Sequence, residues 1–480
     1  MKRIALVISY LFSFYFSNCQ IQEANCFTIL VGKNASTDGS VFLAHNEDDA
    51  GELIVDLHKV PRGSSGSKIR ISDSSFIKSN IQNSYLWIEV QAQDFADEFM
   101  NEFGVTICSN GMQSKEKNGY GTLGYYLRKT LAIEARSARE AVKIAGKLIE
   151  EYGYASSGRS YSIADPNEAW LLEIVNGKHW IAKRLPDDEI AIIPNYYIIK
   201  EVTLSDTTNY LGSSDLINYA MQSGWYDQKQ SQSFNFRTVY GDPKRLSAVW
   251  NISRKWVALN YFSNQQYDFK SDFPFSFKPK SKVALQDLIY ILKNHYEGTK
   301  YETKSIRHNG NPHKNNIMRV CSEYNQYSCI AQLRNWLPSD IGNILWFSPR
   351  RPCVQPFIPL YFGTTGLPST FEKESGDKAA ADHFNKEQDF KKLFPNQSSL
   401  VFYEFAEKTD HNYALLISNI EKDRNNIQSE LINNQKAFEQ DVLKNYNADN
   451  GKGRQMVTDY FSKYANLILD NSKRKIKDYK

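Results

Sequence analysis

The chain has 480 residues and a formal net charge of +4, from 58 lysines and arginines against 54 aspartates and glutamates. Its basic residues are scattered rather than clustered, which argues against a nucleic-acid-binding protein. The length allows a large core, in one big domain with additions or in two or three domains. Aromatic residues make up 13% of the chain, a share that favours a β-rich globular protein.

The N-terminus is typical of a secretory signal peptide. Met1–Arg3 is positively charged, and Ile4–Phe16 is an apolar run too short for a transmembrane helix. We expect residues 1–19 to be the signal peptide and the protein to be exported. It would then be periplasmic, secreted, or lipid-anchored at the cell surface through Cys19, and the sequence leaves this choice open.

The first strong structural signal is a β-hairpin. Cys26–Val31 and Val41–Ala44 are apolar, strand-forming runs on either side of a cluster of Asn, Ser, Asp and Gly. The first residue, Cys26, has two interpretations: it is a buried structural cysteine, or, if the chain is cut before it, a nucleophile whose own α-amine is the base. Because Glu23 makes a poor signal-peptidase site, a short propeptide over 20–25, removed by Cys26 itself, is the expected route to a free amine.

Further elements follow in chain order. Strands are expected at 84–90, 105–109, 159–164, 168–175, 179–184, 191–194, 328–334 and 337–347. Helices are expected within 122–152, with a cap at Ser137, and over 281–296. From about residue 372 the chain becomes polar, and helices are expected over 415–446 and 453–480. The predicted domains are therefore 26–371 and a mostly helical C-terminal region, 372–480.

The hairpin carries a family resemblance. The motif Cys-x-Thr-Ile-Leu-Val-Gly-Lys-x-Ala-Ser-x-Asp-Gly-Ser over 26–40, with Ala-x-Asn-Glu-Asp at 44–48, resembles the opening of the cysteine dipeptidases of the N-terminal-nucleophile hydrolase superfamily. These proteins are similar to the secernins and, more distantly, to penicillin V acylases and bile salt hydrolases. Separated motifs extend the resemblance over residues 26–430. It implies an α+β fold, an αββα sandwich of two antiparallel sheets between helices.

The resemblance also implies roles for individual residues. Cys26 is the nucleophile, and Asp48, at the end of the second hairpin strand, holds its ammonium group. Asn195, which follows the strand at 191–194, and Asn110, which follows the strand at 105–109, supply hydrogen-bond donors for the oxyanion.

Two further positions complete the expected set. Arg245 is the candidate for an arginine that the family carries later in the chain. His45 stands where the family usually has Arg, and it is either a weaker cation beside the thiol or a plain strand residue.

The sequence predicts no metal and no cofactor. It contains no Cys-x-x-Cys pair, and no acidic residue lies in metal-ligand register with His308 and His313. Cys321, Cys329 and Cys353 are close enough in sequence for one disulfide, whose pairing stays open.

The leading functional hypothesis is an exported cysteine peptidase that hydrolyses dipeptides through a thioester on Cys26. The alternatives are a linear-amide acylase of the penicillin V or bile-salt type, and a secernin-like surface protein that keeps the fold without turnover. The expected partner is a dipeptide or small amide substrate, with no nucleic acid and no membrane span. Homo-oligomerisation stays open.

Overall fold

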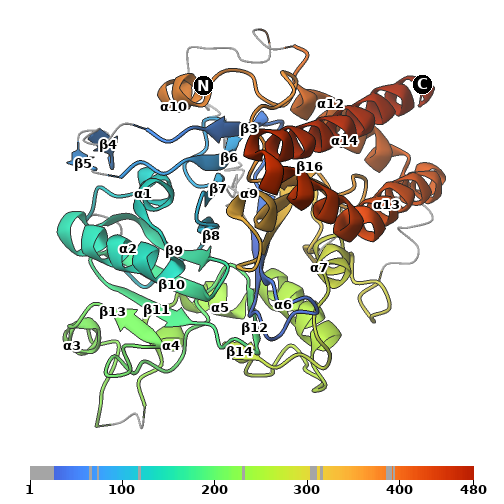
Figure 1. Cartoon of the computed structure of the whole chain (residues 1–480). Coiled ribbons are helices and arrows are strands. Elements are labelled where there is room, and N and C mark those ends of the chain that lie inside the picture. The colour runs from blue at the N-terminus through green and yellow to red at the C-terminus, as the bar shows by residue number, and fades with distance from the viewer. Residues whose placement is uncertain are drawn as a thin grey trace, which may run out of the picture.

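The computed structural model describes residues 26–63, 68–72, 75–79, 81–116, 120–229, 233–302, 311–313, 317–384, 392 and 395–479. These residues form two antiparallel sheets packed face to face, with helices on both outer sides (Figure 1). The expected α+β sandwich is confirmed. The predicted signal peptide, propeptide and Cys19 lie outside the described residues. Within those residues, no helix is both long and apolar enough to cross a membrane.

The first sheet contains the N-terminal hairpin. It has seven strands in the order β14-β12-β1-β2-β15-β16-β17. In the hairpin, β1 (Phe27–Val31) pairs with β2 (Val41–Asp48), and every residue of both strands is buried. This is the burial expected of central strands covered on both faces. The other strands are β12 (Ile190–Ile193), β14 (Ser276–Phe277), β15 (Asn325–Leu333), β16 (Ile344–Pro349) and β17 (Ile358–Tyr361).

The second sheet has eight strands in the order β13-β11-β10-β9-β8-β7-β6-β3. Their bounds are β3 (Val55–Val60), β6 (Tyr85–Val90), β7 (Glu98–Asn101), β8 (Thr106–Gly111), β9 (Tyr154–Ala164), β10 (Ala169–Gly177), β11 (Trp180–Arg184) and β13 (Tyr210–Gly212). β4 (Lys68–Arg70) and β5 (Phe76–Lys78) form a separate small sheet. The predicted strands at 84–90, 105–109, 159–164, 168–175 and 179–184 all belong to the large sheet.

Helices α1 (Tyr126–Glu134) and α2 (Ala138–Tyr152) cover the outer face of the second sheet. The predicted cap is present, because Ser137 Oγ accepts a hydrogen bond from the Glu140 backbone N–H at 3.1 Å. The chain between these two helices is extended at Ala135, so the helical stretch expected over 122–152 is two helices.

The first sheet is covered by α6 (Val249–Phe262), α7 (Leu285–Leu292), α13 (Tyr413–Ala448) and α14 (Asn450–Asp478), and α12 (Ser398–His411) packs on α14. Shorter helices are α3 (Leu216–Gln222), α4 (Phe236–Tyr240), α5 (Pro243–Ser247), α9 (Ser339–Gly342) and α10 (Gly376–Asp382). The helix predicted over 281–296 is therefore shorter, and the strand predicted from 337 begins with α9, since Pro338 starts a helical turn.

The two long C-terminal helices lie where the sequence predicted helices, and they share the main core. Leu431 and Val442 of α13 and Phe461 of α14 belong to the same buried apolar cluster as β1 and β2. At the end of β15, both Nη atoms of Arg334 donate to the carboxylate of Glu439 on α13, at 2.7 and 2.8 Å. Both side chains are almost buried, so a desolvated ion pair joins α13 to the sheet.

Replacing Glu439 with alanine is expected to lower the free energy of unfolding by about 3–5 kcal/mol, because it leaves Arg334 buried without its charge partner. Urea denaturation measures this change. Glu404→Ala is the matched control, since Glu404 is an exposed residue of α12 that pairs with Lys408, and its loss is expected to cost less than about 1 kcal/mol. Equal small losses at both sites would show that the buried pair stabilises the fold no more than the exposed one.

Candidate active site

Cys26 directly precedes β1 and is only 1% exposed. Its thiol donates to Glu47 Oε1 on the paired strand at 3.1 Å, and its sulfur also accepts from the backbone N–H of Asp48. Its carbonyl oxygen accepts a hydrogen bond from Arg254 Nη1 at 3.2 Å. Burial, followed by the charge of Glu47 when that carboxyl is ionised, raises the pKa of the Cys26 thiol well above its usual value. In the uncut chain the thiol therefore holds its proton.

Asp48 ends β2 and is buried beside Cys26. Its Oδ1 accepts from Ser322 Oγ at 3.0 Å and from Asn325 Nδ2 at 2.6 Å. Its Oδ2 lies 3.9 Å from Arg254 Nη1 and has no hydrogen-bond donor among the described residues. Burial raises the pKa of Asp48, although Arg254 and Ser322 act in the opposite direction. The hairpin thus places one unsatisfied carboxylate oxygen close to Cys26.

Arg254 lies on α6 and is fully buried. Its Nη2 donates to Asn195 Oδ1 at 2.8 Å and to Asn251 Oδ1 at 3.1 Å. Asn195, which follows β12, donates its Nδ2 to the carbonyl of Gly111 at 3.0 Å. The guanidinium therefore connects Asn195 to the carbonyl of Cys26. Because Oδ1 of Asn195 faces the guanidinium, its Nδ2 points away from Arg254.

The structure does not bring Arg245 into this set. Arg245 lies on α5, where its Nε donates to Gln113 Oε1 at 3.1 Å and its guanidinium stacks over the Trp250 ring. Arg254, nine residues further along the chain and on the next helix, α6, contacts Cys26 instead. A signal for it was present in the sequence: Asn251 and Arg254 are spaced i, i+3 on the apolar, buried face of a helix, where polar side chains need a specific partner.

His45 lies inside a chain of side-chain hydrogen bonds. Its Nδ1 lies 2.8 Å from Thr28 Oγ1, which donates to Asn110 Oδ1 at 2.7 Å. Asn110 Nδ2 donates to the carbonyl of Ile193 at 3.2 Å, which fixes the orientation of that amide. Burial lowers the pKa of His45 to about 4, so the ring is neutral at physiological pH. The structure therefore places a neutral imidazole, rather than a cation, near Cys26.

The direction of these bonds determines the protonation of Glu47. The Thr28 hydroxyl donates to Asn110, so it accepts from the N–H of His45 Nδ1. The neutral ring then presents Nε2 as an acceptor, 3.0 Å from Glu47 Oε2, and the carboxyl must supply the proton. Burial raises the pKa of Glu47 to about 8, which agrees with a protonated carboxyl. Hydrogen bonds thus run in one direction from the Cys26 thiol to Asn110.

Glu47 was not anticipated as a site residue, although it stands in the Asn-Glu-Asp motif across the hairpin from Cys26. The donor atoms of Cys26, His45 and Glu47 lie within 4.8 Å of one another, a spacing that a metal ion could bridge. Hydrogen bonds among these three side chains already pair each donor with an acceptor, so the cluster is complete with its own protons. Two further groups of potential metal ligands lie elsewhere among the described residues: Asp56, His58 and Glu89, and His295, His313, Cys321 and Cys353.

Comparisons with known proteins identify the family of the chain. The model of Peptidase family C69 matches residues 25–118 and 126–412. The chain is 27% identical over 372 residues to a "Probable dipeptidase" of Latilactobacillus sakei, covering 74% of this chain and 77% of that protein. It is also 27% identical over 381 residues to "Dipeptidase A" of Lactobacillus helveticus, covering 73% and 78%.

Among solved structures, the chain is similar to penicillin V acylase from Agrobacterium tumefaciens, with 13% identity, a TM-score of 0.33, and coverage of 68% of this chain and 82% of that one. The family model spans well over half of the chain and begins one residue before Cys26. The family resemblance seen in the hairpin motif is thereby confirmed, and the chain belongs to peptidase family C69.

Proposed function

We propose that this protein is a cysteine dipeptidase whose nucleophile is Cys26, activated by its own α-amine after the chain is cut before it. The observation that carries the proposal is that Arg254 joins the Cys26 carbonyl to Asn195, while Asp48 lies beside Cys26 at the start of β1. The family match and the dipeptidase names of the relatives support a peptide substrate with two residues.

The reaction follows from these groups. The α-amine takes the thiol proton, and the thiolate sulfur attacks the peptide carbonyl carbon. Asn195 Nδ2 and a backbone N–H stabilise the oxyanion. The C–N bond then breaks, the α-ammonium gives its proton to the leaving amine, and the acyl group stays on Cys26 as a thioester. Water, deprotonated by the same α-amine, hydrolyses the thioester and frees the thiol.

Asp48 and Arg254 position the α-amine and the carbonyl of Cys26, respectively. A freed ammonium on Cys26 is a hydrogen-bond donor of the kind that the buried Asp48 Oδ2 lacks among the described residues. Arg254 binds the Cys26 carbonyl and fixes the backbone beside the thiol. A buried carboxylate that meets a cation loses part of its desolvation penalty, so the cut stabilises this arrangement.

Glu47 and His45 act as positioning residues in this proposal. A protonated Glu47 accepts the thiol hydrogen bond without placing a negative charge beside the sulfur. A charged Glu47 would oppose formation of the thiolate. The neutral pair of Glu47 and His45 therefore makes it easier for the α-amine to remove the thiol proton.

Export and self-processing belong to the same proposal. The charged and apolar start of the sequence supports export, and the poor signal-peptidase site before Cys26 supports removal of residues 20–25 by Cys26 itself. The second candidate is a surface protein of this fold without turnover. The neutral His45 favours this candidate: a cation at that position would promote formation of the thiolate, and a neutral ring does not.

Intact-mass measurement of the protein exported by its native secretion route tests the proposal directly. The mature chain is expected to begin at Cys26, to hydrolyse dipeptides, and to lose that activity when one thiol reacts with iodoacetamide. Cys26→Ala should keep residues 20–25 and abolish hydrolysis, whereas Cys108→Ala should be cut normally. A folded, exported protein with an intact bond before Cys26 would overturn the dipeptidase and leave the non-catalytic candidate.

Arg254→Lys is expected to lower kcat/KM by about 10²-fold, because a lysine cannot hold Asn195 and the Cys26 carbonyl at the same time. Steady-state hydrolysis of a dipeptide measures the change. Arg245→Lys, on α5 and outside the hydrogen bonds to Cys26, is the matched control, with a loss at least about tenfold smaller. The reverse ranking would show that the family arginine is Arg245.

Glu47→Gln is expected to flatten the pH dependence of stability. The native pKa of Glu47 is about 8, above the unfolded value of about 4.5, so between these pH values the native state binds a proton that the unfolded chain releases. Stability falls there as pH rises, by up to about 1.4 kcal/mol per pH unit from this group. Urea unfolding of the variant from pH 5 to 8 should show a smaller slope, while Glu404→Gln keeps the wild-type slope. An unchanged slope in Glu47→Gln would contradict a protonated Glu47.

A further inference from the structure

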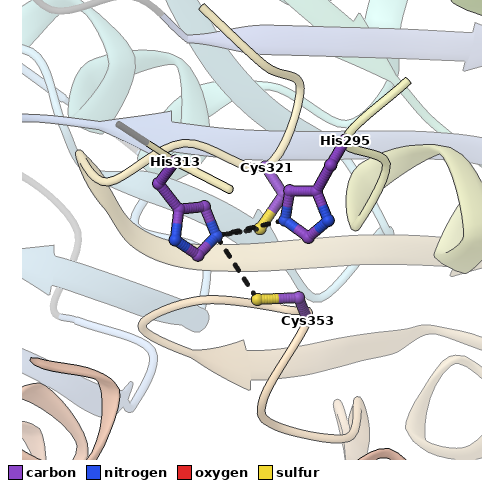
Figure 2. Close-up of side chains that lie close together, drawn as sticks. All are labelled: His295, His313, Cys321 and Cys353. Carbon is purple, nitrogen blue, oxygen red and sulfur yellow. Dashed lines mark hydrogen bonds between the residues drawn. The ribbon is translucent and has the colours of Figure 1, made fainter. Parts of the chain in front are cut away.

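Two histidines and two cysteines from separate parts of the chain converge on one buried point (Figure 2). His295 follows α7, His313 lies in the segment 311–313, Cys321 precedes β15, and Cys353 follows β16. All four side chains are buried, and one ligand atom from each lies within 4.8 Å of the other three. None of these residues has a role in the proposed dipeptidase chemistry.

The distances between these atoms match the edges of a small tetrahedron. The two Nε2 atoms, of His295 and His313, are 3.1 Å apart, and His313 Nε2 lies 3.6 Å from Cys321 Sγ and 3.5 Å from Cys353 Sγ. Zinc bonds of about 2.0–2.1 Å to nitrogen and about 2.3 Å to sulfur give tetrahedral edges of about 3.3 Å between nitrogens and about 3.6 Å between nitrogen and sulfur. The three distances are therefore close to those of a tetrahedral zinc site, and the other three are within 4.8 Å.

Carboxylates orient both rings toward this centre. His313 Nδ1 lies 3.1 Å from Asp410 Oδ1, and His295 Nδ1 lies 3.0 Å from Glu297 Oε1. Each carboxylate lies where it accepts the Nδ1 proton of its ring, and the two Nε2 atoms are turned toward each other at 3.1 Å. Two imidazole nitrogens this close are held together by a proton shared between them or by a metal ion that binds both. Carboxylate–histidine pairs are the usual support for a metal-bound imidazole.

The two cysteines do not satisfy this centre as a disulfide. Both are free thiols, so the bridge that the sequence left open is not formed between them. A disulfide would also remove both thiols as partners of the two imidazole nitrogens, since a bridged sulfur carries no proton to donate. Thiolates, in contrast, complete a four-ligand set with the two nitrogens.

We propose that His295, His313, Cys321 and Cys353 bind one Zn²⁺ ion in a structural site. The two thiols release their protons to solvent on binding, and the two thiolates neutralise the charge of the ion. Four protein ligands close the tetrahedron, which is the arrangement of structural rather than catalytic zinc. The expectation of a chain without metal is replaced by this proposal.

The zinc site would also support the candidate active site. Ser322, the residue after Cys321, donates to Asp48, and Asn46 of the same motif donates to the carbonyls of Leu292 and Val320 at 2.9 and 2.8 Å. These backbone positions lie just before His295 and Cys321. The ion would therefore hold in place the segments on which the end of β2 rests.

No local pattern could have revealed the set. Its ligands are spread over 59 residues, from His295 to Cys353, and only tertiary packing brings them together. His308, the histidine that the sequence placed near His313, lies outside the described residues.

Elemental analysis of the full chain, purified without chelator and with reduced thiols, tests the proposal. About one zinc per chain is expected. Cys353→Ser and His295→Gln should lose most of it, whereas Cys108→Ala, which removes a buried thiol outside the cluster, should retain it. A chelator that extracts the ion should lower the Tm of the wild type and leave that of the Cys353→Ser protein unchanged.

Cobalt substitution keeps the test decisive if the variants fold poorly. Co²⁺ added to the zinc-depleted wild type should produce strong visible absorption and a thiolate-to-cobalt charge-transfer band, the signature of a tetrahedral site with sulfur ligands. Wild-type protein that contains no metal and gives no such bands would overturn the proposal. So would a Cys321–Cys353 disulfide, seen as a mass two hydrogens lower than that of the reduced chain.

Discussion

The candidate active site depends on one buried cation, the guanidinium of Arg254. It binds the carbonyl of Cys26, the side chain of Asn195 and, at longer range, the carboxylate of Asp48. These groups come from the N-terminal hairpin and from the end of β12, and an arginine can join them because its planar fork carries five donors. Removing such a cation from water is costly, and the cost is offset only when its donors are used, so the segments must meet in one geometry.

The same constraint explains the acids of the hairpin. Glu47, Asp48 and Asp49 follow one another at the end of β2, and burial raises the pKa of each. The interior tolerates them in different ways: Glu47 keeps its proton and pairs with His45, while Asp48 uses neutral donors and a nearby guanidinium. Glu47 and Asp48 therefore have different partners: Glu47 bonds the neutral ring of His45, whereas Asp48 lies near a guanidinium and keeps one oxygen without a donor among the described residues.

Support for this hairpin comes from outside it. The segment that carries Cys321 also carries Ser322, whose hydroxyl bonds Asp48, and the proposed zinc site would fix that segment. On the other side, α13 is joined to the first sheet by the Arg334–Glu439 pair and shares its apolar core. The C-terminal helices are thus part of the sandwich that surrounds the site rather than an independent addition.

The sequence by itself determined what local chemistry controls. Period-two and period-3.6 apolar patterns located most strands and both long C-terminal helices, and Ser137 marked a helix start, because these features depend on neighbours within a few residues. The Cys26 motif identified the family because it, too, is a pattern of residues close together in the sequence. Tertiary structure alone decided that Arg254 rather than Arg245 reaches Cys26, that Glu47 is protonated, and that four ligands from His295 to Cys353 meet. Contacts across such distances, and the desolvation that shifts a pKa, arise only when the sheets and helices pack.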